Sequence, residues 1–271
     1  MRAIVVAVLL ILLPAAAAAQ ATQEADEAFQ KGVEAYQRGD YAEAMALWRP
    51  LAEGGAAWVQ YNVGYMYLEG TGVPRDDAEA ARWFRLAAEA GDDKAQYMLG
   101  IMHREGLGVA QDDVEAVRWY TLSAAQGNTA AQSNLGFMYV HGLGVAGDPA
   151  EGAAWYRKAA DQGVSEAQYN LAQMYERGEG VEADLAEAFR LYEAAAEQGF
   201  LNAQFNLATM YYFGNGVAAN AVLAHFWFGL AAAQGDAEAL KNQGVVAEKL
   251  SPAELAESDG LAAEWRARHG Q

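Results

Sequence analysis

The chain has 271 residues, of which 53% are hydrophobic, and it contains no cysteine. This excludes a disulfide framework and a lipid anchor on cysteine. With 36 acidic and 18 basic residues, the net charge is −18. Phosphate backbones and anionic lipid headgroups should repel such a chain, so we expect no nucleic-acid partner, and the acidity also keeps an alanine-rich chain soluble.

The N-terminus has the pattern of a secretory signal peptide. Arg2 is followed by an apolar run from Ala3 to Leu13 and then by an alanine tract that ends at Ala19. A short apolar region before an A-x-A site is typical of a cleaved signal peptide, whereas a membrane anchor needs about 20 apolar residues. We expect residues 1–19 to be removed, no membrane insertion afterwards, and a periplasmic or secreted protein.

Residues 24–55 are predicted to form a helix pair, with its turn at Gly39-Asp40 in "YQRGDYAEAMALW". From about residue 56 to residue 235, the chain consists of five repeats of 36 residues. The positions that recur at this step include a glutamine, a methionine and two glycines: Gln60, Gln96, Gln132, Gln168 and Gln204; Met66, Met102, Met138, Met174 and Met210; Gly70, Gly106, Gly142, Gly178 and Gly214; and Gly72, Gly108, Gly144, Gly180 and Gly216. Such a period predicts one array of stacked units rather than separate domains.

Each repeat is predicted to contain two helices, as the second repeat illustrates. Ala95, Leu99 and Met102 lie at helical spacing and form the apolar stripe of a first helix, which ends at Gly106 because glycine readily adopts the left-handed conformation of a helix C-terminus. Asp112 and Glu115 then form a D-x-x-E capping box that begins a second helix. The box recurs as Asp76 with Glu79, Asp148 with Glu151 and Asp184 with Glu187, whereas the fifth repeat has Asn220 and Leu223 and is expected to be capped more weakly.

The last segment, residues 236–271, is predicted to hold two capping helices. A first-type helix begins at Asp236 but no G-x-G-V turn follows it, and Ser251-Pro252-Ala253-Glu254 predicts a capping box with proline at the first helical position. A terminal helix with a charged outer face closes the exposed end of a solenoid. The whole chain is therefore expected to be all-α, with about 14 helices.

The repeat pattern A-Q-x-x-L-G-x-M-Y/H-x-x-G-x-G-V-x-x-D-x-x-E-A-x-x-W-Y/F resembles the Sel-one-like repeat, a relative of the tetratricopeptide repeat, over about 180 residues. Residues 24–55 resemble a plain tetratricopeptide unit because their turn lacks the G-x-G-V insertion. The resemblance implies a right-handed α-solenoid of stacked antiparallel helix pairs and an adaptor role in a bacterial secreted protein.

Gly142, Gly144 and Gly147 match the G-x-G-x-x-G fingerprint of dinucleotide-binding loops. That loop requires a preceding strand and a βαβ unit, whereas the residues before Gly142 form an amphipathic helix. The third glycine is replaced by Gln111, Ala183 and Ala219 in sister repeats. We therefore interpret G-x-G as a helix stop and a turn, and we expect no cofactor.

No set of residues marks a catalytic or metal site. His103 occupies the place of a tyrosine in the sister repeats and is interpreted as a packed substitute, while His141, His225 and His269 have no carboxylate or thiolate at metal-ligand spacing. No serine lies in G-x-S-x-G or S-x-x-K. We therefore expect a non-enzymatic protein, with a cell-wall-related hydrolase as the alternative.

In the family that the chain resembles, the first helix of each repeat lines the concave face. The side chains opposite the packing stripe then form a predicted binding surface. They are Tyr61, Tyr65, Lys94, Tyr97, Ile101, Arg104, Phe137, Tyr169, Phe205 and Tyr212. Aromatic residues give a large contact area with few rotatable bonds, but the same residues could instead be packing residues of the repeat.

Asn62, Asn134, Asn170, Asn206 and Asn242 recur where some tetratricopeptide proteins clamp a terminal carboxylate. Because basic partners are few, we interpret these asparagines as hydrogen-bonding the next helix pair. The sequence thus predicts a scaffold that binds a protein or peptide partner in the groove of the solenoid. A purely structural, self-associating module is a further alternative.

Overall fold

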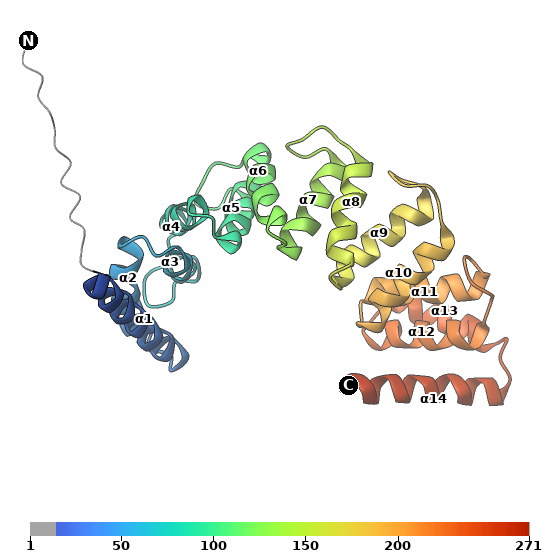
Figure 1. Cartoon of the computed structure of the whole chain (residues 1–271). Helices are drawn as coiled ribbons and strands as arrows, with labels where there is room; N and C mark the ends of the chain where they lie inside the picture. Colours follow the sequence, from blue (N-terminus) through green and yellow to red (C-terminus); the bar gives the residue numbers. More distant parts are fainter. Residues whose placement is uncertain (1–14, 271) are drawn as a thin grey trace, which may run out of the picture. The chain divides into compact units, whose positions relative to one another are not determined.

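The computed structural model describes the backbone of residues 15–270 and the side chains from residue 23 onward. The described residues form fourteen α-helices and no strand, so the all-α prediction is confirmed (Figure 1). The helices are α1 (Ala15–Gln37), α2 (Tyr41–Glu53), α3 (Ala57–Glu69), α4 (Asp77–Glu89), α5 (Asp93–Glu105), α6 (Asp113–Ala125), α7 (Thr129–His141), α8 (Pro149–Ala160), α9 (Ser165–Arg177), α10 (Leu185–Glu197), α11 (Leu201–Phe213), α12 (Ala221–Ala233), α13 (Ala237–Ala247) and α14 (Pro252–His269). Residues 1–14 of the predicted signal peptide lie outside the described part of the chain.

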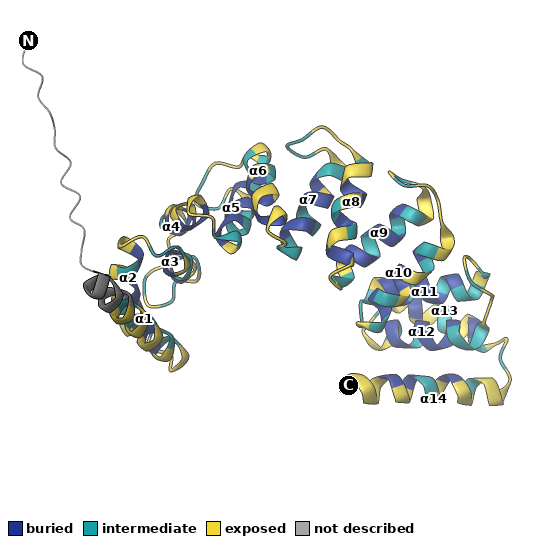
Figure 2. Ribbon diagram, viewed as in Figure 1, coloured by how far each residue is buried: buried dark blue, intermediate teal, exposed yellow. Residues whose placement is uncertain are grey.

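The chain divides into two compact units, which we call the N-terminal unit (residues 1–111, with α1 to α5) and the C-terminal unit (residues 112–271, with α6 to α14). Within each unit, helices that follow one another in sequence pack together, as α3 does with α4 and α7 with α8. The buried residues lie on the sides of the helices that face their neighbours (Figure 2). Each unit is therefore a stack of helix pairs, as a solenoid fold requires.

Both glycines of the G-x-G turn are structurally required, as the second repeat shows. Gly106 ends α5 with a φ of 69°, and its N–H donates to the carbonyl of Met102. Gly108 has a φ of 67°, and a Cβ placed on it would lie 2.1 Å from the carbonyl oxygen of Asp77, at the start of α4 in the previous repeat. The first glycine thus ends a helix, and the second lets two repeats approach closely.

The predicted aspartate caps are confirmed. The predicted return bond, in which the aspartate N–H donates to the glutamate side chain three residues later, is wrong. The Asp184 side chain accepts from the N–H groups of Ala186 and Glu187. Its own N–H donates to the carbonyl of Tyr175 at 3.0 Å, so Glu187 does not reach back and instead pairs with Arg190 at 2.7 Å.

The N–H groups of Asp76 and Asp148 likewise donate to the carbonyls of Tyr67 and Tyr139. The predicted two-way box forms at Ser251 and Glu254. Asn220 accepts from one N–H, that of Leu223, where the aspartates accept from two, which agrees with the weaker cap expected in the fifth repeat.

The recurring glutamine of each repeat is buried and joins two helices. The Nε2 of Gln204 donates to the carbonyl of Ala196, eight residues earlier, at 3.2 Å. The same bond forms at Gln60, Gln96, Gln132 and Gln168, with lengths of 3.0 to 3.2 Å. Each first-type helix is thus bonded to the helix that precedes it.

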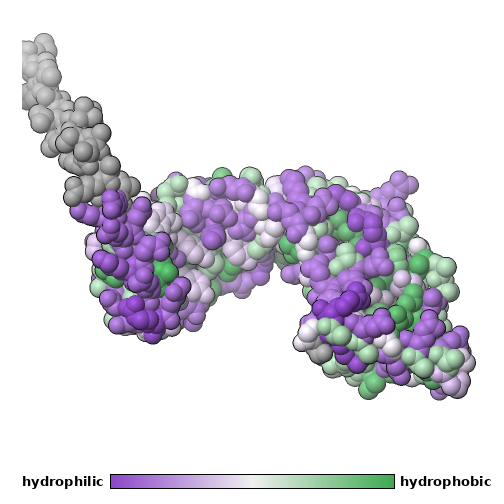
Figure 3. Space-filling model, turned by 60° about the horizontal axis from the view of Figure 1, so that its bottom comes forward, coloured by the Kyte–Doolittle hydropathy of each residue, from purple (hydrophilic) through white to green (hydrophobic). Residues whose placement is uncertain are grey.

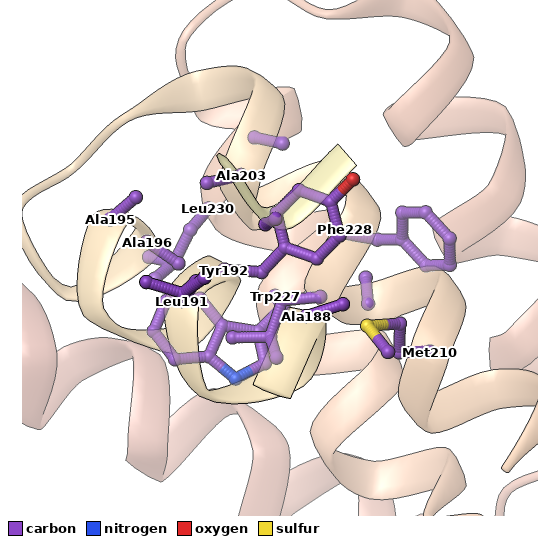
Figure 4. Close-up of a cluster of buried hydrophobic side chains, with 14 of the residues drawn as sticks. Ala188, Leu191, Tyr192, Ala195, Ala196, Ala203, Met210, Trp227, Phe228 and Leu230 are labelled. Carbon is purple, nitrogen blue, oxygen red and sulfur yellow. The ribbon is translucent and has the colours of Figure 1, made fainter. Parts of the chain in front are cut away.

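A continuous apolar core runs through the C-terminal unit from α8 to α14. In Figure 4, Tyr192 and Leu191 of α10 lie with Trp227 and Phe228 of α12 among alanine side chains. These alanines permit close helix packing, and the aromatic rings fill the space between pairs. Helix α14 packs on α12 and buries Trp265, which is 1% exposed, so α14 forms the cap expected at the end of the array.

Candidate binding clefts

An apolar cleft of about 270 Å³ lies between α11, α12 and α13 of the C-terminal unit. Phe213, which is 66% exposed, and Val245, which is 45% exposed, stand at its surface. On the face seen in Figure 3, hydrophobic side chains form patches among the hydrophilic ones of this unit. The residues that line the cleft are Phe205, Thr209, Tyr212, Phe213, Phe228, Glu238, Asn242, Val245 and Val246.

A second, more polar cleft adjoins the first. It is lined by Tyr169, Asn202, Phe205, Asn206, Asp236 and Glu238 and has a similar volume of about 270 Å³. Because Phe205 and Glu238 line both clefts, the two form one surface along α9, α11 and α13, which we call the C-terminal groove.

Charged side chains of both signs lie along the C-terminal groove. Asp236 and Glu238 lie at the N-terminus of α13, where the Asp236 side chain accepts from the N–H groups of Glu238 and Ala239. Elsewhere along the groove, the Nζ of Lys249 lies 4.4 Å from the centre of the Tyr212 ring and donates to the Tyr212 hydroxyl. Acidic groups therefore lie where the two clefts join, and a lysine lies beside Tyr212.

The aromatic side chains of the groove are held by the helices beneath them. The Phe205 ring packs edge-on against Phe228 at 5.4 Å, and the Tyr169 ring lies 5.2 Å from Phe200 and 5.8 Å from Tyr192. Gln173 donates to the Tyr169 hydroxyl at 2.9 Å. Burial raises the pKa of Tyr169, so this phenol remains a neutral hydrogen-bonding group.

A further pocket of about 420 Å³ lies in the N-terminal unit between α1, α2 and α3. It is lined by Phe29, Val33, Tyr36, Gln37, Trp48, Tyr61, Asn62 and Tyr65, and we call it the aromatic pocket. Of the predicted binding residues, Tyr61 and Tyr65 lie here, whereas Tyr169, Phe205 and Tyr212 lie in the C-terminal groove.

The remaining predicted residues line neither site. Lys94, Tyr97, Ile101 and Arg104 lie on α5 with partly or fully exposed side chains, and Arg104 pairs with Glu105 at 2.9 Å. Phe137 on α7 is 38% exposed and packs edge-on against His141 at 4.2 Å. That these side chains contact a partner stays a prediction.

The family model of the Sel1 repeat matches the chain five times, at residues 59–92, 93–128, 129–164, 165–200 and 201–236. The chain belongs to the Sel1 repeat family. Among solved structures, it is similar to a protective antigen of uropathogenic Escherichia coli strains with an SLR fold, at 34% identity and a TM-score of 0.82 over 93% of this chain. It spans 56% of the length of that antigen.

A Sel1 repeat protein from Oxalobacter formigenes is also similar, at 33% identity and a TM-score of 0.74, with coverage of 79% of this chain and 88% of that one. No curated protein sequence matches the chain. Both structural similarities support the solenoid of Sel1 repeats that the sequence predicts.

Some residues of the groove that sequence reasoning missed, such as Thr209, Phe213 and Phe228, lie within the last Sel1 repeat, whereas Glu238 and Val245 follow it. Glu238 lies 36 residues after Asn202, and Val245 lies 36 residues after Thr209. Extending the repeat step into α13 would therefore have found both, although α13 lacks the G-x-G-V turn. The recurring asparagines also contribute, because Asn62, Asn206 and Asn242 line the clefts. Asn206 lies near enough to the hydroxyls of Tyr169 and Tyr192 to lower the pKa of both phenols, against the effect of burial. It therefore faces the preceding helix pair and not the next one that the sequence predicted.

Two histidines of the Sel1 array are buried. His103 is 7% exposed, which agrees with its interpretation as a packed substitute for tyrosine. His225 on α12 has its Nδ1 at 2.8 Å from the Oγ of Ser258 on α14, a contact that the sequence did not predict. Because Ser258 is 1% exposed, the pair joins two helices and does not present a nucleophile to solvent.

The described residues contain neither a candidate membrane span nor a candidate metal cluster. None of their helices is both long enough and apolar enough to span a membrane. No three or more histidine or acidic side chains within residues 23–270 are grouped so that they could hold a metal ion.

Proposed function

We propose that this Sel1 repeat protein is a non-enzymatic scaffold that binds a peptide segment of a partner protein in the C-terminal groove. Sel1 repeats commonly mediate protein–protein interaction. The observation that carries the proposal is the continuity of the two clefts through Phe205 and Glu238. This gives an extended surface with apolar and polar parts, as peptide recognition needs.

The chemistry of the groove defines the segment that fits it. Asp236 and Glu238 attract a basic side chain, and the exposed ring of Phe213 with Val245 offers an apolar place in the cleft that Glu238 also lines. The net charge of −18 favours the approach of a basic partner. We infer a segment in which a lysine or arginine precedes or follows a large apolar residue.

Selection from a displayed library of random peptides tests this proposal. Peptides with the inferred pattern should be enriched, and Glu238→Gln should weaken their binding. Glu182→Gln is the matched control, because Glu182 is an exposed acid in the G-x-G-V turn of the fourth repeat, outside the groove, and the substitution removes the same charge. Equal binding by both variants, or enrichment of acidic peptides, would contradict the proposal.

The same purified protein distinguishes the other candidate functions. Sedimentation of the free chain as an oligomer with no peptide enriched would support a self-associating structural module. Turnover of peptidoglycan fragments, lost on a single carboxylate or serine substitution, would establish a cell-wall-related hydrolase.

We also propose that the protein acts in the periplasm or outside the cell. The pattern of residues 1–19 supports this, with an apolar run followed by Ala17-Ala18-Ala19. N-terminal sequencing of the protein from its native cells should give Gln20 as the first residue. A chain that still begins at Met1 would contradict export through a cleaved signal.

A further inference from the structure

The aromatic pocket of the N-terminal unit is enclosed by two groups of rings. Between α1 and α2, the Trp48 ring lies nearly parallel to Phe29 at 5.7 Å and to Tyr36 at 5.8 Å. On α3, the Tyr61 and Tyr65 rings lie nearly parallel to each other at 6.5 Å. Five π systems therefore line a single cavity of about 420 Å³.

The Trp48 side of the pocket is fixed in place. The indole N–H of Trp48 donates to the carbonyl of Phe29 at 3.2 Å. A Cβ on Gly32 would lie 2.2 Å from the Trp48 Nε1, so the glycine is what allows the indole to lie against α1. Because Trp48 is 4% exposed, this wall is formed before any ligand arrives, which lowers the entropic cost of binding.

The electrostatic surroundings of the pocket favour a cation. None of its lining side chains carries a charge, and its polar groups include the amides of Gln37 and Asn62 and the hydroxyls of its tyrosines. Burial raises the pKa of the Tyr61 phenol, and Tyr65 and the nearby carboxylates of Asp92 and Asp93 raise it further. A positive group inside the pocket would meet aromatic rings and amide oxygens, with carboxylates close by.

We propose that the aromatic pocket binds a guanidinium group, the side chain of an arginine presented by a partner peptide. A guanidinium is planar and weakly hydrated and stacks on aromatic rings, whereas an ammonium is compact and strongly hydrated. Its N–H groups would donate to the amide oxygens of Gln37 and Asn62. This site lies in the N-terminal unit and does not depend on the C-terminal groove.

The test is a titration of the full chain with N-acetyl-arginine amide, followed through the NMR signal of the Trp48 indole N–H. The matched ligand is N-acetyl-citrulline amide, which has the same shape without the charge. Saturable binding of the arginine compound, with clearly weaker binding of the citrulline compound, is the expected result. Equal binding of both, tighter binding of N-acetyl-phenylalanine amide, or no saturable shift would overturn the proposal.

Two variants test whether the arginine compound binds in the aromatic pocket. Tyr65→Leu removes one ring and should weaken binding of the arginine compound about two- to fivefold, as expected for one exposed cation–π contact. Phe137→Leu is the control, since Phe137 is an equally exposed aromatic residue, at 38%, on a first-type helix of the C-terminal unit. An equal loss in both variants would also contradict a site at Tyr61 and Tyr65.

Discussion

The side chains of Gln198 and Gln168 form a partly buried hydrogen bond between the two helices of one Sel1 repeat, with the Nε2 of Gln198 at 2.9 Å from the Oε1 of Gln168. Gln162 with Gln132 and Gln234 with Gln204 repeat this bond at the same length. Each accepting glutamine also donates to a helix carbonyl. One buried amide therefore connects three helices through both of its polar atoms.

Replacement of Gln198 by methionine should destabilise the fold. Methionine keeps the length of the side chain but has no donor, so the Oε1 of Gln168 would become a buried acceptor without a partner, at a cost of about 1–3 kcal/mol. Urea unfolding followed by circular dichroism measures the change. A midpoint equal to that of the unmodified chain would show that this bond contributes nothing.

The N-terminal unit offers the reverse experiment at Gln60. Its Oε1 is buried without a hydrogen-bond partner, and position 90, which is equivalent to Gln162 and Gln198, is an alanine. Ala90→Gln should supply the missing donor and raise the free energy of unfolding by about 1 kcal/mol. Ala90→Met is the control, because it adds similar bulk without a donor and should not stabilise.

Replacement by alanine should destabilise the fold more at the second glycine of a G-x-G turn than at a glycine between repeats. Gly180 and Gly163 both have a positive φ, of 70° and 86°. A Cβ on Gly180 would lie 2.3 Å from the backbone of Pro149, whereas one on Gly163 has no heavy atom within 4 Å. Gly163→Ala should therefore cost about 1–2 kcal/mol, from its backbone conformation alone.

Gly180→Ala should cost more, because it also forces two repeats apart. Thermal unfolding of the two variants gives the comparison. Equal losses of melting temperature would mean that the close approach to Pro149 is not needed for stability.

The contact between His225 and Ser258 should make the attachment of α14 sensitive to pH. Burial lowers the pKa of His225 from its usual 6.5, against an opposing effect of Asp259. Above 6.5 the imidazole is neutral in both folded and unfolded chains, and its stabilising effect is complete. As the pH falls from 6.5 towards the folded pKa, the unfolded chain binds a proton that the folded chain does not, so stability decreases.

Urea unfolding between pH 8 and pH 5 measures this effect. His225→Gln should flatten the pH dependence of stability in that range, whereas His141→Gln, at an exposed position, should leave it unchanged. Asp259 and Arg266 are the charged side chains that line the same small cavity as His225. An unchanged pH dependence in His225→Gln would exclude this histidine as the cause.

The periodicity of the sequence predicted most of the fold because each repeat carries its own helix ends. Gly106 and Asp112 lie where the structure ends α5 and begins α6. Partners of backbone groups were harder to predict. The N–H of Asp184 bonds the carbonyl of Tyr175, nine residues earlier, and this choice depends on how the turn folds back, which a capping motif alone does not reveal.

The candidate sites were predicted only in part. Tyr169, Phe205 and Tyr212 could be found from their repeat register, and the structure shows that such rings both pack on the helices beneath and line the groove. Glu238 could be found only by extending the repeat step beyond the last matched repeat into α13. The contact of His225 with Ser258 depends on α14, which does not follow the repeat pattern, so spacing within the repeats could not identify it.

The contacts that join helices within a repeat and between successive repeats all span short distances along the chain. Gln204 bonds a residue 8 positions earlier, Gln198 bonds one 30 positions earlier, and Gly180 approaches one 31 positions earlier. None of these contacts depends on the total number of repeats. A block of 36 residues could therefore be duplicated or deleted while every remaining repeat keeps contacts with a neighbouring repeat. A change of one or two residues within a repeat would instead displace these partners. Evolution can therefore alter the length of this solenoid by whole repeats, at little risk to the fold.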